Sequence, residues 1–87
     1  MKPMGQILPI FIKKVDAGAY PAVLLNDIGA LSQQIANDLN ENNADEAKNF
    51  LGYLLDKGYV EIKPNQGIIL KRSDPDIAEI IKKILST

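Results

Sequence analysis

The first part of the chain places apolar residues at the spacing of an α-helix. One stripe along residues 4–17 consists of Ile7, Leu8, Phe11, Ile12 and Val15. This pattern predicts an amphipathic helix over about 4–17. Pro9 has no amide hydrogen for the preceding turn, so the helix either begins near Leu8 or carries a kink. Gly18 can adopt the left-handed conformation that ends a helix.

A second helix is predicted over about residues 28–39, beginning from Asp27 or Ser32 as the cap. Its apolar face consists of Leu31, Ile35, Ala36 and Leu39. The preceding run, residues 20–25, is equally compatible with a brief strand and with a helical turn. The segment 40–43 has no apolar residue and is rich in asparagine, which predicts a tight turn.

A third helix is predicted over residues 43–57. Asn43 and Glu46 have the spacing of a capping box, and Gly58 is a helix-stopping residue. The inward face would carry Ala47, Phe50, Leu51, Leu54 and Leu55. Tyr53 and Tyr59 are expected at the edge of the core.

After Gly58 the apolar period changes from helical to alternating. Two runs of β-favouring residues flank the turn Pro64-Asn65-Gln66-Gly67, which predicts a β-hairpin over residues 59–71. Ser73-Asp74-Pro75 then has the form of a helix cap and predicts a last helix over 75–86. Its apolar stripe consists of Ile77, Ile80, Ile81, Ile84 and Leu85. Asp74-Pro75-Asp76 lacks the ligand spacing and glycine of a calcium loop, so a cap is preferred there over a metal site.

Composition limits what such a chain can do. Its 87 residues, 46% of them hydrophobic and 24% charged, fit one folded domain over 1–87. Cysteine and histidine are absent, so the usual zinc sites, thiolate nucleophiles and imidazole bases are excluded. No enzymatic activity, metal or cofactor is expected. The apolar runs are too short for a membrane span and no secretory signal is recognisable, which makes the cytosol the default location.

From Leu31 onward the chain resembles the winged helix-turn-helix superfamily. The resemblance rests on residues 31–36 of the second helix, residues 50–60 of the third helix and its exit, and residues 61–70 of the hairpin, or wing. It implies a mostly helical α+β fold in which the first helix and the hairpin close over one core. Ile35, Leu39, Phe50 and Leu54 should lie in that core.

In DNA-binding members of this superfamily the third helix enters the major groove and the wing follows the backbone or the minor groove. Carried over to this sequence, the resemblance implies contacts from Asn42, Asn43, Lys48, Asn49, Lys63, Asn65, Gln66, Lys71 and Arg72. Asn49 would bind adenine, and Lys48 would bind guanine or phosphate. Gly52 would permit close approach of another backbone.

Charge argues against this interpretation. The net charge is −1, whereas DNA binding draws on several Lys or Arg contacts to phosphate. Between residues 28 and 58 five acidic residues stand against two lysines. Asp45 and Glu46 can favour the helix start, but Asp38 and Glu41 have no such explanation in the sequence.

Two functions therefore stay open. The first is a homodimeric DNA-binding protein, either a transcriptional regulator or a site-specific DNA binder, whose dimer interface would use Ile77, Ile80, Ile81 and Ile84. The second is a protein-interaction module whose acidic helix-turn-helix face meets a basic partner. Clustering of Lys13, Lys14, Lys63, Lys71 and Arg72 beside the third helix would favour DNA, and their dispersal would favour a protein.

Overall fold

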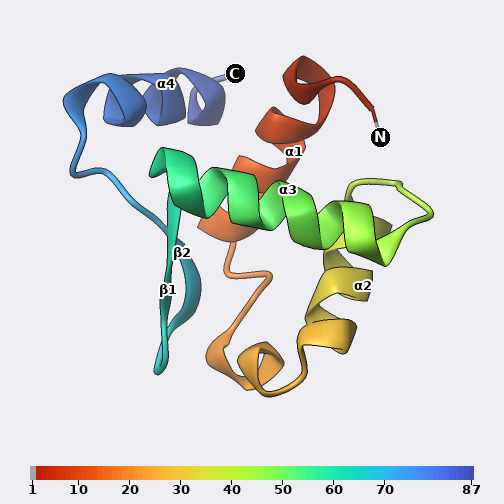
Figure 1. The fold of residues 1–87 in the computed structure, drawn as a ribbon. Coiled ribbons are helices and arrows are strands. Elements are labelled where there is room, and N and C mark those ends of the chain that lie inside the picture. Colours follow the sequence, from red (N-terminus) through yellow and green to blue (C-terminus); the bar gives the residue numbers. More distant parts are fainter. Residues whose placement is uncertain (1) are drawn as a thin grey trace.

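Helices, an antiparallel hairpin and a C-terminal helix follow one another in the computed structural model, which describes residues 2–87 (Figure 1). The elements are α1 (Met4–Asp16), the 3₁₀ helix η1 (Ala22–Asn26), α2 (Ile28–Asp38), α3 (Ala44–Lys57), β1 (Val60–Lys63), β2 (Gly67–Leu70) and α4 (Pro75–Leu85). The expected mostly helical α+β fold, with a hairpin before the last helix, is confirmed. In the segment left open at residues 20–25, a 3₁₀ helix begins at Ala22, so the helical alternative holds there and no strand forms.

Pro9 lies inside α1, which begins at Met4 and not near Leu8. Pro9 cannot donate to the carbonyl of Gly5, four residues earlier. Gly5 is exposed, so water can satisfy that carbonyl and the helix continues through the proline.

The helix ends follow the local chemistry of the chain. Asp27, Asn43 and Asp74 cap α2, α3 and α4 with their side chains. At the other end of α3, Gly58 has a φ of +83°, and the amide of Tyr59 donates to the carbonyl of Leu54. This left-handed cap turns the chain out of α3 and directly into β1.

One core joins α1, α2 and α3. Phe11 of α1 lies at its centre, where its ring stacks on Tyr20 at a centroid distance of 5.4 Å and meets the edge of Phe50 at 5.5 Å. The four residues expected at the centre of the core, Ile35, Leu39, Phe50 and Leu54, are all buried. Ile81 of α4 is buried in the same cluster, so the last helix is part of the fold.

The hairpin is fixed to the segment after α1. Strands β1 and β2 pair antiparallel, with Val60 opposite Leu70 and Lys63 opposite Gly67. On its other edge, β2 receives the Tyr20 backbone, because the amide of Ile68 donates to the carbonyl of Tyr20 at 3.0 Å. A Cβ on Gly67 would stand 2.1 Å from that carbonyl oxygen, so only glycine fits there.

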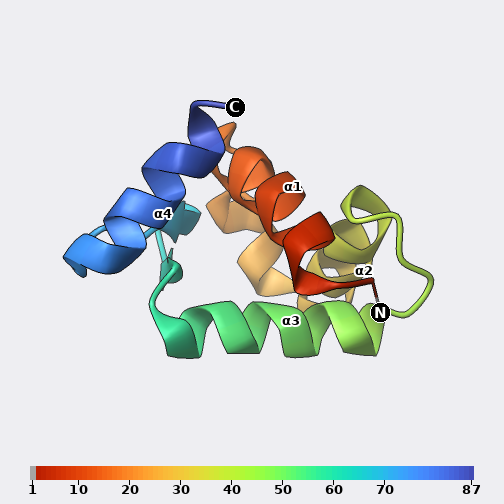
Figure 2. The same ribbon diagram turned by 90° about the horizontal axis from the view of Figure 1, so that it is seen from above.

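Helix α3 runs along one side of the molecule, while α4 and the C-terminal end of α1 occupy the other (Figure 2). The hairpin descends from the C-terminal end of α3, and the α2–α3 turn lies at its N-terminal end (Figure 1). Within residues 2–87, no helix has the length and apolar character that crossing a membrane requires.

Candidate nucleic-acid interface

The outward face of α3 is the surface that was expected from the sequence to contact DNA. Ala47, Phe50, Leu51 and Leu54 turn inward and are buried. At about 100° per residue, the opposite side carries Asp45, Lys48, Asn49, Gly52, Tyr53 and Asp56, all of them exposed. Among residues 2–87, the side chains of Lys48 and Asn49 make no hydrogen bond or ion pair within the domain. Both side chains are therefore available to a partner molecule.

Charge is not uniform across this face. By helix geometry Asp45 and Asp56 lie near its middle line, together with Asn49 and Gly52. Lys48 lies on one flank of that line. The middle line therefore carries two carboxylates, and the nearest cation stands to one side of it.

Asn43 has a structural function that limits any role in contact with DNA. Its Oδ1 accepts hydrogen bonds from the amides of Asp45 at 2.9 Å and Glu46 at 3.2 Å. The expected cap at Asn43 is thereby confirmed, and its acceptor oxygen is engaged at the helix start. Asn42, beside it, is exposed.

The hairpin residues lie at the other end of α3. Asn65 and Gln66 are exposed at the tip, and Lys63 forms an ion pair with Glu61 on the same strand at 3.1 Å. Lys71, just past β2, is half-buried. The structure thus separates the proposed contacts into two groups, one at each end of α3 (Figure 1).

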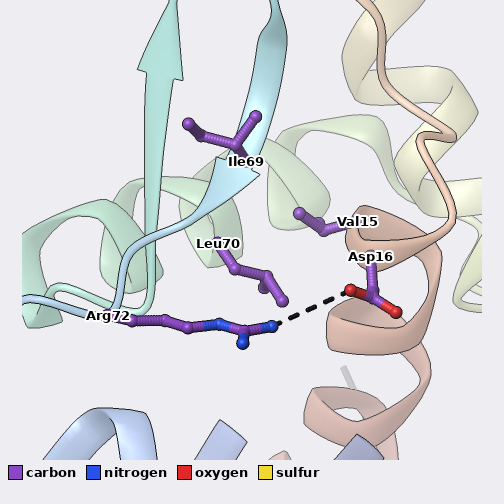
Figure 3. A pocket seen from close by; sticks show the side chains of 5 residues that line it. All are labelled: Val15, Asp16, Ile69, Leu70 and Arg72. Atoms are coloured by element: carbon purple, nitrogen blue, oxygen red, sulfur yellow. Dashed lines mark ion pairs between the residues drawn. The ribbon is translucent and has the colours of Figure 1, made fainter.

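Arg72 extends away from α3 toward the end of α1. Its Nη2 lies 3.9 Å from Oδ1 of Asp16, across a shallow pocket of about 300 Å³ (Figure 3). Val15, Ile69 and Leu70 form the rest of the lining. Both charged groups are about half exposed, so solvent screens the pair and it contributes little to stability.

The remaining basic residues are dispersed over the surface. Lys13 donates from Nζ to the carbonyl of Thr87 at 3.4 Å, at the chain end that lies far from α3 in Figure 2. Lys82 and Lys83 are exposed on α4. In the described part of the chain, Lys13 and Arg72 therefore do not join the hairpin lysines beside α3, and this dispersal is the arrangement that favours a protein partner.

Asp38 and Glu41, which had no explanation in the sequence, have structural partners. Oδ2 of Asp38 accepts a hydrogen bond from the Tyr20 hydroxyl at 2.9 Å. Oε1 of Glu41 accepts from the backbone amide of Lys2 at 2.8 Å and holds the N-terminal segment against the α2–α3 turn. These two carboxylates fix local structure, although they keep their negative charge.

Burial changes the acidity of Tyr20. Desolvation raises the pKa of its phenol far above the usual range, and the hydrogen bond to the negative Asp38 raises it further. Tyr20 therefore stays protonated and acts as a fixed donor. No local pattern in the sequence indicates this pair, because residues 20 and 38 belong to segments whose mutual position is set by the fold.

The four isoleucines expected at a dimer face on α4 differ in how far their own domain covers them. Ile81 is fully buried in the single chain, and Ile77 and Ile84 pack partly against the same core. Only Ile80 of the four is counted among the exposed apolar residues, with 39% of its surface accessible. The periodic stripe of α4 is therefore largely the side that covers α1.

A groove that the sequence did not indicate lies between α3 and the N-terminal end of α1. It has a volume of about 320 Å³ and is lined by Met4, Glu46, Asn49, Phe50 and Tyr53. Tyr53 was expected at the edge of the core, but 44% of its surface is accessible. The expectation was wrong because the core closes on the side of α3 that carries Phe50 and Leu54, and Tyr53 lies beside it.

Comparisons with known proteins give no relative: no family model, no curated protein and no solved structure matches this chain. Residues 2–87 also contain no group of three or more metal-ligating side chains. Any assignment of function must therefore rest on the fold and on the surface described above.

Proposed function

We propose that the chain is a winged helix-turn-helix domain. The order α1, η1, α2, α3, hairpin, α4 supports this assignment, as does the packing of α2 on α3 across a five-residue connection, residues 39–43. A further support is the bond from Ile68 to Tyr20, which anchors the hairpin to the segment between the first two helices. In this assignment α3 is the recognition helix and the hairpin is the wing.

We further propose that this domain binds double-stranded DNA through α3 and the wing. The observation that carries the proposal is the pair Lys48 and Asn49, which project from α3 away from the core with no partner in the described chain. An asparagine in the major groove can form a bidentate contact with adenine, and a lysine can bind guanine or phosphate. Gly52, one turn further, would allow the helix to approach the groove wall closely.

Contacts from the wing would be secondary. Lys71 is the wing cation without an ion-pair partner among residues 2–87, and Lys63 and Arg72 would have to leave Glu61 and Asp16 to reach phosphate. Exposed ion pairs of this kind contribute about 0–1 kcal/mol, so exchanging them for phosphate contacts has a small cost. Few free cations imply that only a few phosphates are neutralised by each chain.

The test is a fluorescence anisotropy titration with a random-sequence DNA duplex at low salt, repeated as the salt concentration rises. The proposal expects binding that weakens with salt, with a shallow slope that reflects few phosphate contacts. Lys48→Glu should abolish binding and Lys71→Glu should weaken it, while the control Lys82→Glu on α4 should leave it unchanged. A folded wild-type protein that does not bind the duplex at low salt would refute the proposal.

A second candidate function, binding of a basic protein, is favoured by two observations: the basic residues are dispersed over the described surface, and Asp45 and Asp56 occupy the middle line of α3. Complementary charge would attract a basic surface to that line. The double variant Asp45→Asn/Asp56→Asn separates the two candidates. It should strengthen DNA binding, because two carboxylates leave the groove-facing side, whereas it should weaken capture of a basic protein.

A further inference from the structure

The groove between α1 and α3 is an exposed apolar feature of the described surface. Met4 at its rim is 37% accessible and Tyr53 is 44% accessible, while Phe50 forms a buried floor. Leaving apolar groups of this size in water is unfavourable, and grooves with polar rims often mark association sites. The occupant can be inferred from the charge pattern of α3 itself.

Four residues of α3 form a stripe along the groove flank: Glu46, Phe50, Tyr53 and Lys57. Their spacing of four, three and four residues keeps them on one side of the helix. The two ends of the stripe carry opposite charges, separated by about 16 Å along the axis. Nζ of Lys57 lies 5.7 Å from the centroid of the Tyr53 ring, which holds the lysine on this flank.

We propose that a second copy of this chain docks here, with the two α3 helices antiparallel about a twofold axis. The stripe is self-complementary in that arrangement. When the axis passes between positions 51 and 52, Glu46 faces the partner's Lys57, and Tyr53 faces the partner's Phe50 at the floor of the groove. Each contact then occurs twice, as an isologous interface requires.

Glu46 already takes part in an interaction within its own chain. A carboxylate offers about four acceptor positions, so Glu46 can face a partner ammonium while it keeps that interaction. The ion pair at each end sets the direction and register of the helices, and the apolar centre supplies most of the affinity.

The alternative surfaces are less suitable. Antiparallel contact along the middle line of α3 would place Asp45 opposite the partner's Asp56, which is a repulsive arrangement. On α4, Ile81 is enclosed by its own domain. The groove flank combines exposed apolar surface with charges that match under twofold symmetry.

Such a pair also has a consequence for DNA, which rests on the proposed function. Packed helices lie about 8–10 Å apart, whereas two recognition helices must be about 34 Å apart to enter successive major grooves. The paired form therefore holds α3 in a geometry that cannot read two half-sites. Self-association and DNA binding should compete, so the domain would bind DNA as the separated form.

Sedimentation equilibrium of the full chain, without DNA, tests the pairing. Wild type should shift from monomer to dimer as its concentration rises. Tyr53→Ala should lower the association constant about tenfold or more, as expected for a central aromatic residue. Ile80→Ala, a matched removal of an exposed apolar side chain on α4, should leave the constant unchanged. A wild type that stays monomeric, or an association lost through Ile80→Ala and not Tyr53→Ala, would overturn the proposal.

A charge exchange tests the register. Glu46→Lys alone and Lys57→Glu alone should each weaken pairing, because each homodimer then contains two like-charge contacts. An equimolar mixture should restore it, since both contacts of the mixed dimer join opposite charges. Circular dichroism verifies that each variant is folded. No recovery in the mixture of folded variants would overturn the antiparallel arrangement.

Anisotropy titrations with the DNA duplex separate this proposal from the proposed function. Tyr53→Ala should bind DNA more tightly than wild type at concentrations where wild type is dimeric. Pairing without any DNA binding would refute the DNA function and leave the dimer standing. If wild type bound DNA with the same affinity at concentrations where it is dimeric as where it is monomeric, the proposed competition would be wrong.

Discussion

The hydroxyl of Tyr20 donates a hydrogen bond to Oδ2 of Asp38 at 2.9 Å and thereby joins the segment after α1 to the end of α2. The same tyrosine stacks on Phe11 through its ring and accepts the amide of Ile68 through its backbone carbonyl. One residue therefore holds α1, α2 and the hairpin in their relative positions. The orientation of the hairpin beside α3 depends on it.

Tyr20→Phe should remove the hydroxyl while it preserves the ring packing. The expected loss is about 1 kcal/mol in the free energy of unfolding, the usual contribution of one hydrogen bond, with a larger loss if Asp38 is left poorly solvated. Urea denaturation measures it. Tyr53→Phe is the matched control, because that hydroxyl makes no hydrogen bond among residues 2–87 and its removal should change stability little.

The raised pKa of Tyr20 predicts a loss of stability in alkali. The folded state keeps the phenol protonated, whereas the unfolded chain releases the proton near pH 10. Below that pH the contribution is fully present. Above it the unfolded state binds fewer protons, so stability falls by roughly 1.4 kcal/mol per pH unit until the folded-state pKa is reached. Wild type should therefore lose stability more steeply above about pH 10 than Tyr20→Phe does. Equal slopes in urea titrations would contradict the prediction.

Gly67→Ala should be strongly destabilising. The new Cβ would meet the carbonyl oxygen of Tyr20 at 2.1 Å, and the φ of +94° is unfavourable for alanine. We expect a loss of at least about 2 kcal/mol. Gly52→Ala, with open space around the new methyl group, should instead stabilise α3 by about 0.5–1 kcal/mol. Thermal unfolding of both variants tests the contrast.

Asn43→Ala should lower stability by about 1 kcal/mol, since it removes the side-chain cap of α3. Any loss of DNA affinity in this variant would then arise from fraying of the helix start. Asn42→Ala is the control, because that exposed side chain makes no hydrogen bond in residues 2–87. If both variants unfold at the wild-type denaturant concentration, the capping role of Asn43 is wrong.

The sequence predicted the succession of elements because each signal was local. The change of period at Gly58, the cap at Asn43 and the alternation after Tyr59 all act within a few residues. It misplaced Tyr53 because a helical period identifies a stripe and leaves open where the neighbouring elements stop covering it. The Tyr20–Asp38 bond and the groove at Met4 depend on segments brought together only by the fold.

Ile81 and Ile80 adjoin on α4 but should respond differently to truncation. Ile81 is fully buried and Ile80 is 39% accessible. Ile81→Ala should lower the free energy of unfolding by about 2–5 kcal/mol through lost packing and a cavity, while Ile80→Ala should cost about 1 kcal/mol or less. Urea denaturation at several protein concentrations measures both. If α4 were instead the dimer face, Ile80→Ala would remove the concentration dependence of stability, because dissociation of subunits is then coupled to unfolding.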